Sequence, residues 1–287
     1  MPSIDIHQHF WPEPFIAVLR ARDNPPHLQG DVLVLLEGRF AIDLRQDDLD
    51  ARLDMLDEDE IDAAVISLQP TLGTGDLPPS ERDELEHAWI EGARDVVAAS
   101  DGRLRAFAPG RYVSGFAGTS IDGRAFEDLD RVAALLDELE RHSSPLFVHP
   151  GAVTRSQHVP DWWTAVVDYT AQMHAAYFRW LAEGRGRWPS LRIAFAILAG
   201  GAPFQLERLG QRGPATRSAL DANVYLDVAT YARRSIELCA ETFGVERLLY
   251  GSDRPVVDPT ATLRAVRGFG ESVEKLLTVD NPTSFLR

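Results

Sequence analysis

Short apolar runs alternate with longer amphipathic segments along most of the chain. The runs are a few residues long, and several are rich in valine, isoleucine or phenylalanine, which is typical of β-strands. Their continuous apolarity, without alternating polar residues, indicates strands buried on both faces, as in a parallel sheet. Eight runs fit this description: 4–6, 63–68, 104–108, 116–121, 146–148, 193–198, 224–228 and 248–250.

The segments between the runs carry apolar residues at the spacing of amphipathic α-helices. They are 47–58, 80–99, 126–141, 162–183, 203–208, 233–243 and 260–269. Eight strands alternating with helices predict an α/β protein with a closed (β/α)₈ TIM barrel. An open doubly wound sheet is the competing architecture. It is disfavoured because no glycine-rich phosphate-binding turn follows any predicted strand.

One segment interrupts the alternation between the first strand and the first predicted helix. Residues 31–43 have the pattern of two strands around a Glu37-Gly38 turn. We therefore expect a small β-hairpin inserted after strand 1, placed to cover the mouth of the barrel. No internal repeat or interdomain linker is visible, so residues 1–287 are predicted to form a single barrel domain.

Composition limits the functions and the cellular compartment that can be expected. The 29 basic and 44 acidic residues give a formal net charge of −15, which argues against binding to nucleic acid or an anionic membrane surface. The apolar runs are far shorter than the roughly 20 residues that span a bilayer. The single cysteine excludes an intramolecular disulfide, and no export signal is visible at the start. A cytoplasmic enzyme is the expectation.

Two histidines, His7 and His9, stand at the end of the first apolar run. Residues two apart in a strand point to the same face and lie roughly 6.6 Å apart along the chain, so both imidazoles can reach one metal ion. The competing interpretation is that the two histidines simply form a polar strand end. A metal site needs more than two ligands from the protein. The hypothesis therefore depends on further ligands.

Two other predicted strand ends carry suitable side chains. His149 directly follows the fifth run, and Asp253 follows the eighth. Either could simply cap a strand or form a turn. Functional groups of a barrel gather at the C-terminal ends of its strands, so their joint placement favours a metal site. Three imidazoles and a carboxylate suit Zn²⁺ best, with Mn²⁺, Fe²⁺ and Co²⁺ as alternatives.

Six short motifs occur in order along the whole chain: Ile4-Asp-Ile-His-Gln-His-Phe10, Leu53-Asp-Met-Leu-Asp-Glu-Asp-Glu-Ile-Asp62, Pro145-Leu-Phe-Val-His-Pro150, Arg187-Trp-Pro-Ser-Leu-Arg-Ile193, Gly200-Gly-Ala-Pro203 and Tyr250-Gly-Ser-Asp253. Together they resemble the amidohydrolase superfamily, in its amidohydrolase-related branch. That branch includes aminocarboxymuconate-semialdehyde decarboxylase and related non-oxidative decarboxylases and hydrolases. The resemblance implies a distorted barrel that holds one metal ion through His7, His9, His149 and Asp253.

The resemblance also implies an activity. The first expectation is a metal-dependent hydrolase that acts on a small carboxylated, cyclic or aromatic compound through metal-activated water. Asp253 would then be both a ligand and the catalytic proton acceptor. The alternative is a non-oxidative decarboxylase, a carboxy-lyase, that uses the same metal site. A homodimer is a further implication of the resemblance.

One departure from the family pattern concerns the sixth strand. Family members usually carry a histidine just before the Gly-Gly turn, and the aligned position here is taken to be Leu198. An aliphatic side chain cannot transfer a proton, and a general base contributes about 10²- to 10⁴-fold to a rate. Three explanations stay open: Asp253 transfers the proton itself, His158 or His174 reaches the pocket, or the barrel is catalytically impaired.

Substrate contacts are proposed at three positions. Trp11 follows the first strand closely and is a candidate apolar wall, with a loop anchor as the competing role. Arg155 and Arg254 lie just beyond His149 and Asp253, and either could pair with a substrate carboxylate. Arg254 could equally bind an acidic neighbour inside the fold.

Overall fold

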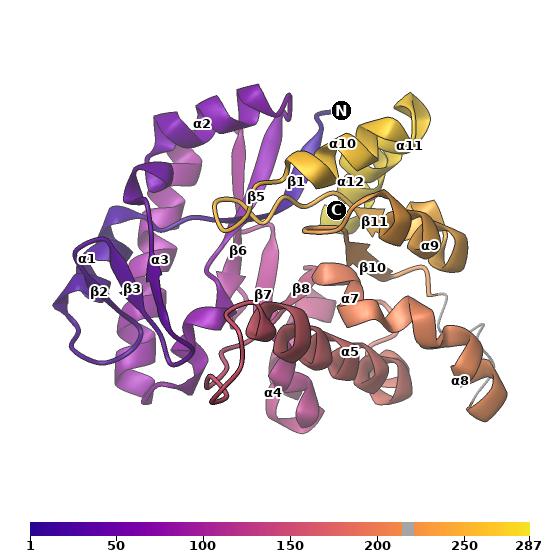
Figure 1. Cartoon of the computed structure of the whole chain (residues 1–287), viewed down its shortest axis with the longest axis horizontal. Helices are drawn as coiled ribbons and strands as arrows, with labels where there is room; N and C mark the ends of the chain where they lie inside the picture. The colour runs from indigo at the N-terminus through magenta and orange to yellow at the C-terminus, as the bar shows by residue number, and fades with distance from the viewer. Residues whose placement is uncertain (214–220) are drawn as a thin grey trace.

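Eight parallel strands form the centre of the molecule (Figure 1). The computed structural model describes residues 1–213 and 221–287. Every one of the eight predicted runs contributes a strand, so the α/β barrel prediction is confirmed. In sheet order the strands are β1 (Ile4–His9), β5 (Ala63–Ser67), β6 (Leu104–Pro109), β7 (Gly118–Asp122), β8 (Leu146–His149), β9 (Ile193–Phe195), β10 (Val224–Asp227) and β11 (Leu248–Leu249).

The sheet closes into a barrel between β1 and the segment that follows β11. The backbone N–H of Ile6 donates to the carbonyl oxygen of Tyr250 at 3.0 Å. The N–H of Asp253 donates to the carbonyl oxygen of His7 at 2.8 Å. Closure therefore places Asp253 beside the end of β1, although the two are far apart in sequence.

Helices surround the barrel (Figure 1). Several begin at side-chain caps: Asp48 accepts from the N–H of Ala51, and Asp128 accepts from the N–H of Asp130. The helices are α1 (Glu13–Ala21), α2 (Leu49–Glu58), α3 (Pro79–Ala99), α4 (Leu129–Arg141), α5 (Tyr169–Arg179), α6 (Arg185–Arg187), α7 (Ile197–Gly201), α8 (Leu206–Arg212), α9 (Arg233–Phe243), α10 (Thr260–Gly268), α11 (Glu271–Lys275) and α12 (Asn281–Leu286).

Several helices differ from the predicted ones, and α7 begins within the sixth predicted run, 193–198. The pattern missed α1, which begins with prolines at its start, and it missed the short helices α11 and α12 at the C-terminus. The single helix predicted over 162–183 begins with a π-helical turn, η5 (Thr164–Asp168), continues as α5 and passes into a second such turn, η6 (Trp180–Gly184). Such turns add one residue to the hydrogen-bonded ring, which hydrophobic periodicity does not reveal.

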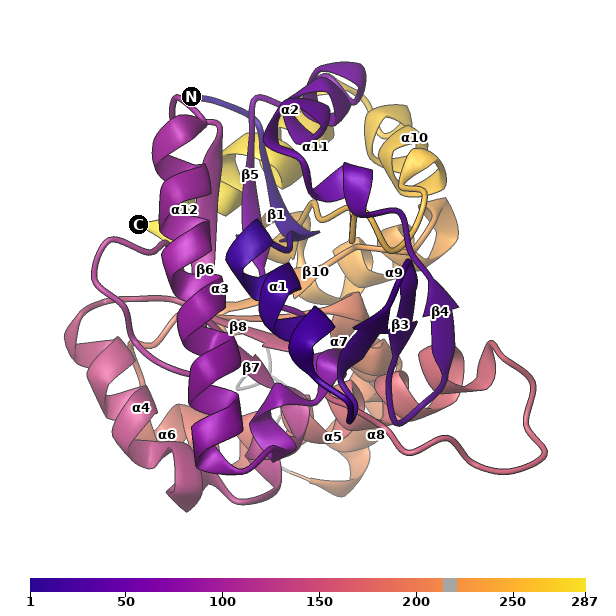
Figure 2. The same cartoon turned by 90° about the vertical axis from the view of Figure 1, so that its left-hand side faces the viewer.

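A second, antiparallel sheet contains the predicted hairpin. Its strands are β2 (His27–Gln29), β3 (Val32–Val34) and β4 (Arg39–Ala41), in that order. The two strands expected within 31–43 are β3 and β4, and β2 is an additional strand too short to recognise from its pattern. Figure 2 shows β3 and β4 beside α1.

The apolar interior of the barrel extends up to the functional residues. All residues of β1 and β5 are buried, as expected for parallel strands covered on both faces. The rings of Phe107 and Phe147 stack with centroids 5.6 Å apart. The ring of Phe147 in turn lies 4.9 Å from that of His7. The imidazole of His7 therefore packs against the apolar interior of the barrel.

No helix among the described residues is both long enough and apolar enough to cross a membrane.

Candidate metal centre

The structure brings together the four side chains that the sequence singled out as ligands. His7 and His9 come from β1, His149 ends β8, and Asp253 follows β11. One ligand atom from each lies within 4.8 Å of all the others. The three histidines are buried, and the Asp253 side chain is 14% exposed. The cluster stands at the C-terminal ends of the strands, where barrel enzymes place their active sites.

The distances among the ligand atoms of His7, His9 and Asp253 fit a single coordination shell. His7 Nε2 lies 3.2 Å from His9 Nε2 and 3.5 Å from Asp253 Oδ1, and His9 Nε2 lies 3.1 Å from the same oxygen. Ligands about 2.1 Å from a tetrahedral ion are about 3.4 Å apart. The donor set of three imidazoles and one carboxylate therefore fits a divalent metal ion.

Each histidine is oriented through its other ring nitrogen. His7 Nδ1 donates to Asp227 Oδ2 at 2.7 Å, and His149 Nδ1 donates to the carbonyl oxygen of Pro150 at 2.9 Å. His9 Nδ1 faces the carbonyl oxygen of Ser67 at 3.3 Å. With Nδ1 bound in this way, the lone pair of Nε2 is directed at the ligand cluster, as in known metal sites.

Asp227 is the functional residue that sequence reasoning missed. It ends β10 and is fully buried, and its Oδ1 also accepts from the N–H of Ala229 at 3.0 Å. Gly251 makes the approach of Asp227 to His7 feasible, because a Cβ at position 251 would lie 2.2 Å from Asp227 Oδ1. The available signal was an aspartate at the end of the seventh predicted run, a position equivalent to that of His149.

Burial and nearby charges shift the pKa values of the three histidines in different directions. Burial lowers the pKa of His9, and it lowers that of His149 well below the ordinary value. Burial also lowers the pKa of His7, but the charges of Asp227 and Asp253 outweigh it and raise the pKa to about 9. His9 and His149 are therefore neutral, which is the form that binds a metal, whereas a binding metal ion has to displace the Nε2 proton of His7.

A cavity of about 880 Å³ opens above the cluster and includes His9, His149 and Asp253 in its lining. This volume suits a small organic substrate. The small sheet contributes part of the wall, as expected for an insertion over the mouth of the barrel. The aliphatic part of the lining includes Leu33, Leu35, Leu72, Ile197, Pro255 and Val256.

Comparison with protein families identifies the family of this chain. A model of the amidohydrolase family matches residues 4–287. The chain belongs to the amidohydrolase family. The resemblance inferred from the motifs is thereby confirmed, as is the expectation of an enzyme of this family.

Relatives of this amidohydrolase include several decarboxylases. It is 20% identical to 2-amino-3-carboxymuconate-6-semialdehyde decarboxylase of Dictyostelium discoideum over 303 residues, 91% of this chain and 83% of the relative. Its fold is similar to that of 2,6-dihydroxybenzoate decarboxylase from Rhizobium, with a TM-score of 0.75, 16% identity, and coverage of 100% of this chain and 98% of the other.

A second similar structure contains a metal ion. It is a variant of 5-carboxyvanillate decarboxylase from Novosphingobium aromaticivorans with bound manganese and 3-methoxy-4-hydroxy-5-nitrobenzoic acid. The TM-score is 0.76 at 18% identity, with 99% of this chain and 97% of the other covered. At such identities the two structural likenesses show the fold alone.

The residue that this amidohydrolase presents to the cavity from the sixth barrel strand is Ile197. Leu198, the position inferred from the sequence, is buried and is not part of the described lining. Ile197, Leu198 and Ala199 all have positive φ, between 45° and 51°. A left-handed backbone changes the side-chain directions expected from a strand, which accounts for Ile197 rather than Leu198 facing the cavity. Both residues are aliphatic, so no proton-transferring group stands here.

The predicted substrate residues have different surroundings. Trp11 lines the cavity, and its Nε1 donates to Gln69 Oε1 at 2.5 Å. Arg155 also lines the cavity, and it pairs with Asp161 at 2.6 Å. Arg254 instead binds Asp59 through two hydrogen bonds of 2.7 and 2.9 Å. The internal ion pair, one of the two roles considered for Arg254, is thus the one in the fold.

Neither histidine considered as a substitute base belongs to the described lining of the cavity. His158 is exposed on the loop after β8. The ring of His174 lies against Phe178 on α5, with centroids 4.9 Å apart. Of the alternatives left open for proton transfer, the geometry keeps Asp253 within the site.

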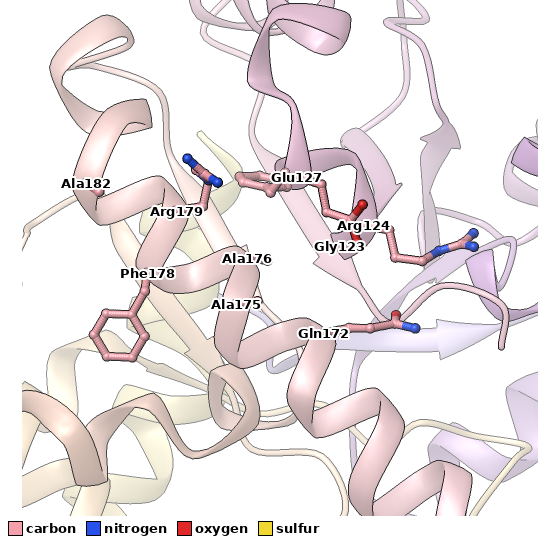
Figure 3. Close-up of a pocket in the computed structure, with 10 residues that line it drawn as sticks. Gly123, Arg124, Glu127, Gln172, Ala175, Ala176, Phe178, Arg179 and Ala182 are labelled. Carbon is pink, nitrogen blue, oxygen red and sulfur yellow. The ribbon is translucent and has the colours of Figure 1, made fainter. Parts of the chain in front are cut away.

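A smaller cavity of about 290 Å³ lies between α5 and the 3₁₀ turn η4 (Gly123–Glu127), as Figure 3 shows. Its two cations are already paired, Arg124 with Asp122 and Asp76, and Arg179 with Glu183. The cations that could bind an anionic ligand there are thus engaged within the protein.

Proposed function

We propose that this amidohydrolase is a metal-dependent non-oxidative decarboxylase, which releases a carboxyl group from a small cyclic or aromatic acid as CO₂. The sequence favoured hydrolysis, with decarboxylation as the alternative. The named relatives are decarboxylases, and they support that alternative better. The observation that carries the proposal is the convergence of His7, His9, His149 and Asp253 below a cavity whose wall is partly aliphatic.

The described lining offers few proton-transferring groups beside the ligands, because Ile197 cannot transfer a proton and Asp253 is itself a ligand. Hydrolysis requires a group that takes a proton from the attacking water. Decarboxylation breaks a carbon–carbon bond and needs no attacking water. The aliphatic part of the wall suits the flat apolar face of a ring.

The residues of the cluster would have two roles, metal binding and proton transfer. His7, His9, His149 and Asp253 would hold the ion, and a bound divalent ion supplies positive charge that fixes the substrate carboxylate or an adjacent oxygen. When the bond to the carboxyl carbon breaks, its electron pair remains on the ring carbon and CO₂ leaves. A proton must then replace the carboxyl group at that carbon. Asp253 lines the cavity and is placed to hold or deliver this proton.

The identity of the ion is part of the proposal. Three imidazole nitrogens favour Zn²⁺, which the sequence also favoured. Manganese in the similar 5-carboxyvanillate decarboxylase supports Mn²⁺ as the alternative. Elemental analysis of the purified protein, followed by chelation and reloading with each ion, distinguishes the two.

The test of the reaction uses the reloaded protein with two panels of compounds. Hydroxybenzoates, aminobenzoates and cyclic unsaturated acids are assayed for CO₂ release, and lactones, amides and esters of the same ring size are assayed for hydrolysis. We expect metal-dependent CO₂ release and no hydrolysis. His149→Ala should abolish both metal binding and CO₂ release, whereas His87→Ala, an exposed position on α3, should change neither. Hydrolysis without CO₂ release would overturn the proposal.

A further inference from the structure

Two polar side chains from distant parts of the chain meet in the wall of the main cavity. Glu37 stands in the turn between β3 and β4, and Tyr169 is the first residue of α5. The Tyr169 hydroxyl donates a hydrogen bond of 2.6 Å to Glu37 Oε2. Both residues line the cavity that contains the metal ligands. The contact joins the small sheet to the barrel helix across the substrate site.

The approach of Tyr169 to Glu37 depends on an irregular helical turn. The π-helical turn η5 immediately precedes it, and such turns commonly accompany functional positions because they redirect side chains. The Thr71 side chain lies within hydrogen-bonding reach of the Tyr169 hydroxyl. Tyr169 is thereby held from two sides, so the carboxylate of Glu37 has a defined orientation.

The second oxygen of Glu37 is available to a ligand. Oε2 accepts from Tyr169, and no side chain or backbone N–H of the described residues donates to Oε1. Burial raises the pKa of Glu37, and the hydrogen bond from Tyr169 opposes that rise. A carboxylate that has lost part of its hydration gains most from a further donor. The missing donor is a group that a substrate can bring.

The charges around the cavity disfavour a second substrate carboxylate. Among the described lining residues the cationic side chains are Arg39 and Arg155. Arg39 is exposed and donates to Gln29 Oε1 at 2.6 Å, and Arg155 pairs with Asp161. A carboxylate near Glu37 would meet like charge with no buried cation to offset it.

The geometry points to Glu37, oriented by Tyr169, as a specificity group that accepts a hydrogen bond from a hydroxyl or amino substituent of the substrate. The substrate would then be a monocarboxylate with one such donor, its carboxylate facing the metal ligands and its donor facing Glu37. This inference rests on the proposed decarboxylation and names the class of acid that the site selects.

The test compares matched ligands on the metal-loaded protein. Hydroxybenzoates with the hydroxyl at each ring position are compared with their methoxybenzoate ethers, which cannot donate, and with the corresponding benzenedicarboxylates. Calorimetry measures binding, and CO₂ release gives KM and kcat. We expect at least one hydroxybenzoate to bind at least tenfold more tightly than its ether and its dicarboxylate, as a hydrogen bond to a charged group allows.

The variants assign the preference to particular atoms. Glu37→Gln should raise Kd and KM for the preferred hydroxybenzoate about tenfold, leave kcat nearly unchanged and leave the ether unaffected. Tyr169→Phe should weaken the preference less, because it removes only the group that orients Glu37. Glu183→Gln is the control, because it removes an exposed carboxylate from η6, outside the lining of the main cavity.

The outcomes separate this inference from the proposed function. If no compound releases CO₂ but the hydroxyl preference exists and Glu37→Gln abolishes it, the reaction is wrong and the specificity role stands. If CO₂ is released and the hydroxyl preference survives in Glu37→Gln, the inference is overturned and the reaction stands. Equal binding of a dicarboxylate, or binding of no member of the panel, also overturns the inferred substrate class.

Discussion

Asp227 Oδ2 lies 2.7 Å from His7 Nδ1, and both side chains are completely buried. The two residues are 220 positions apart in the chain and meet because β10 and β1 belong to the same barrel. The contact fixes which nitrogen of His7 carries the proton and which faces the metal.

The first prediction follows from this contact. Asp227→Ala should weaken metal affinity by about 10- to 100-fold, because His7 loses the acceptor that orients it. Asp227→Asn should weaken the metal affinity less, since the carbonyl oxygen of the amide can still accept a hydrogen bond. Competition with a chromophoric chelator measures the affinity. Asp258→Asn removes an exposed carboxylate and is the control; equal affinities of wild type and Asp227→Ala would contradict the prediction.

A second prediction concerns Arg52, which is completely buried on α2. Its guanidinium donates to Gln8 Oε1 at 3.0 Å, to the carbonyl oxygen of His9 at 2.8 Å and to that of Gln46 at 3.0 Å. Arg52→Met leaves these buried acceptors without a donor, so we expect a loss of about 3 kcal/mol in the free energy of unfolding.

Urea denaturation of the metal-free protein measures this loss. Arg131→Met is the matched control, because its side chain is 84% exposed and such surface changes stay within about 0.5 kcal/mol. An unfolding free energy of Arg52→Met within that margin of the wild-type value would show that the buried guanidinium does not support β1.

A third prediction is a pH dependence of stability from Asp47. Its side chain is 8% exposed, and burial raises its pKa from 3.8 to about 6. The folded state then keeps its proton to a higher pH than the unfolded chain. The contribution of Asp47 to stability is therefore greatest below pH 4 and falls as pH rises to about 6, by at most about 3 kcal/mol.

Asp47→Asn removes this dependence. Unfolding free energies of both proteins, measured with urea and a chelator at pH 4, 5 and 6, should show the wild type losing stability relative to the variant. Asp50→Asn, at an exposed position on α2 three residues further along the chain, controls for the loss of one negative charge. A difference between wild type and Asp47→Asn that is constant with pH would contradict the prediction.

A fourth prediction distinguishes the two aliphatic residues of the sixth strand. Ile197→His places an imidazole in the cavity, where acid–base catalysis contributes up to about 10²- to 10⁴-fold, so turnover on an accepted substrate should rise at least tenfold. Leu198→His buries an unpaired imidazole and should cost about 1–3 kcal/mol of stability without a gain in rate. A faster Leu198→His and an unchanged Ile197→His would restore Leu198 as the family position.

Much of the fold was predictable because its signals are local. The eight apolar runs each contain enough buried side chains to specify a strand, and their alternation with helices specifies the barrel. The elements that were missed are short or irregular: β2 has three residues, and η5 departs from the helical period. In such segments tertiary contacts rather than local pattern decide the conformation.

The sequence by itself determined the barrel class and singled out His7, His9, His149 and Asp253, because a strand pattern places the residue at each strand end at one rim. Only the tertiary structure decided that Asp227 orients His7, that Ile197 rather than Leu198 faces the cavity, and that Glu37 meets Tyr169. These relations depend on barrel closure, a left-handed turn and contacts between residues far apart in the chain, and hydrophobic periodicity carries no information about them.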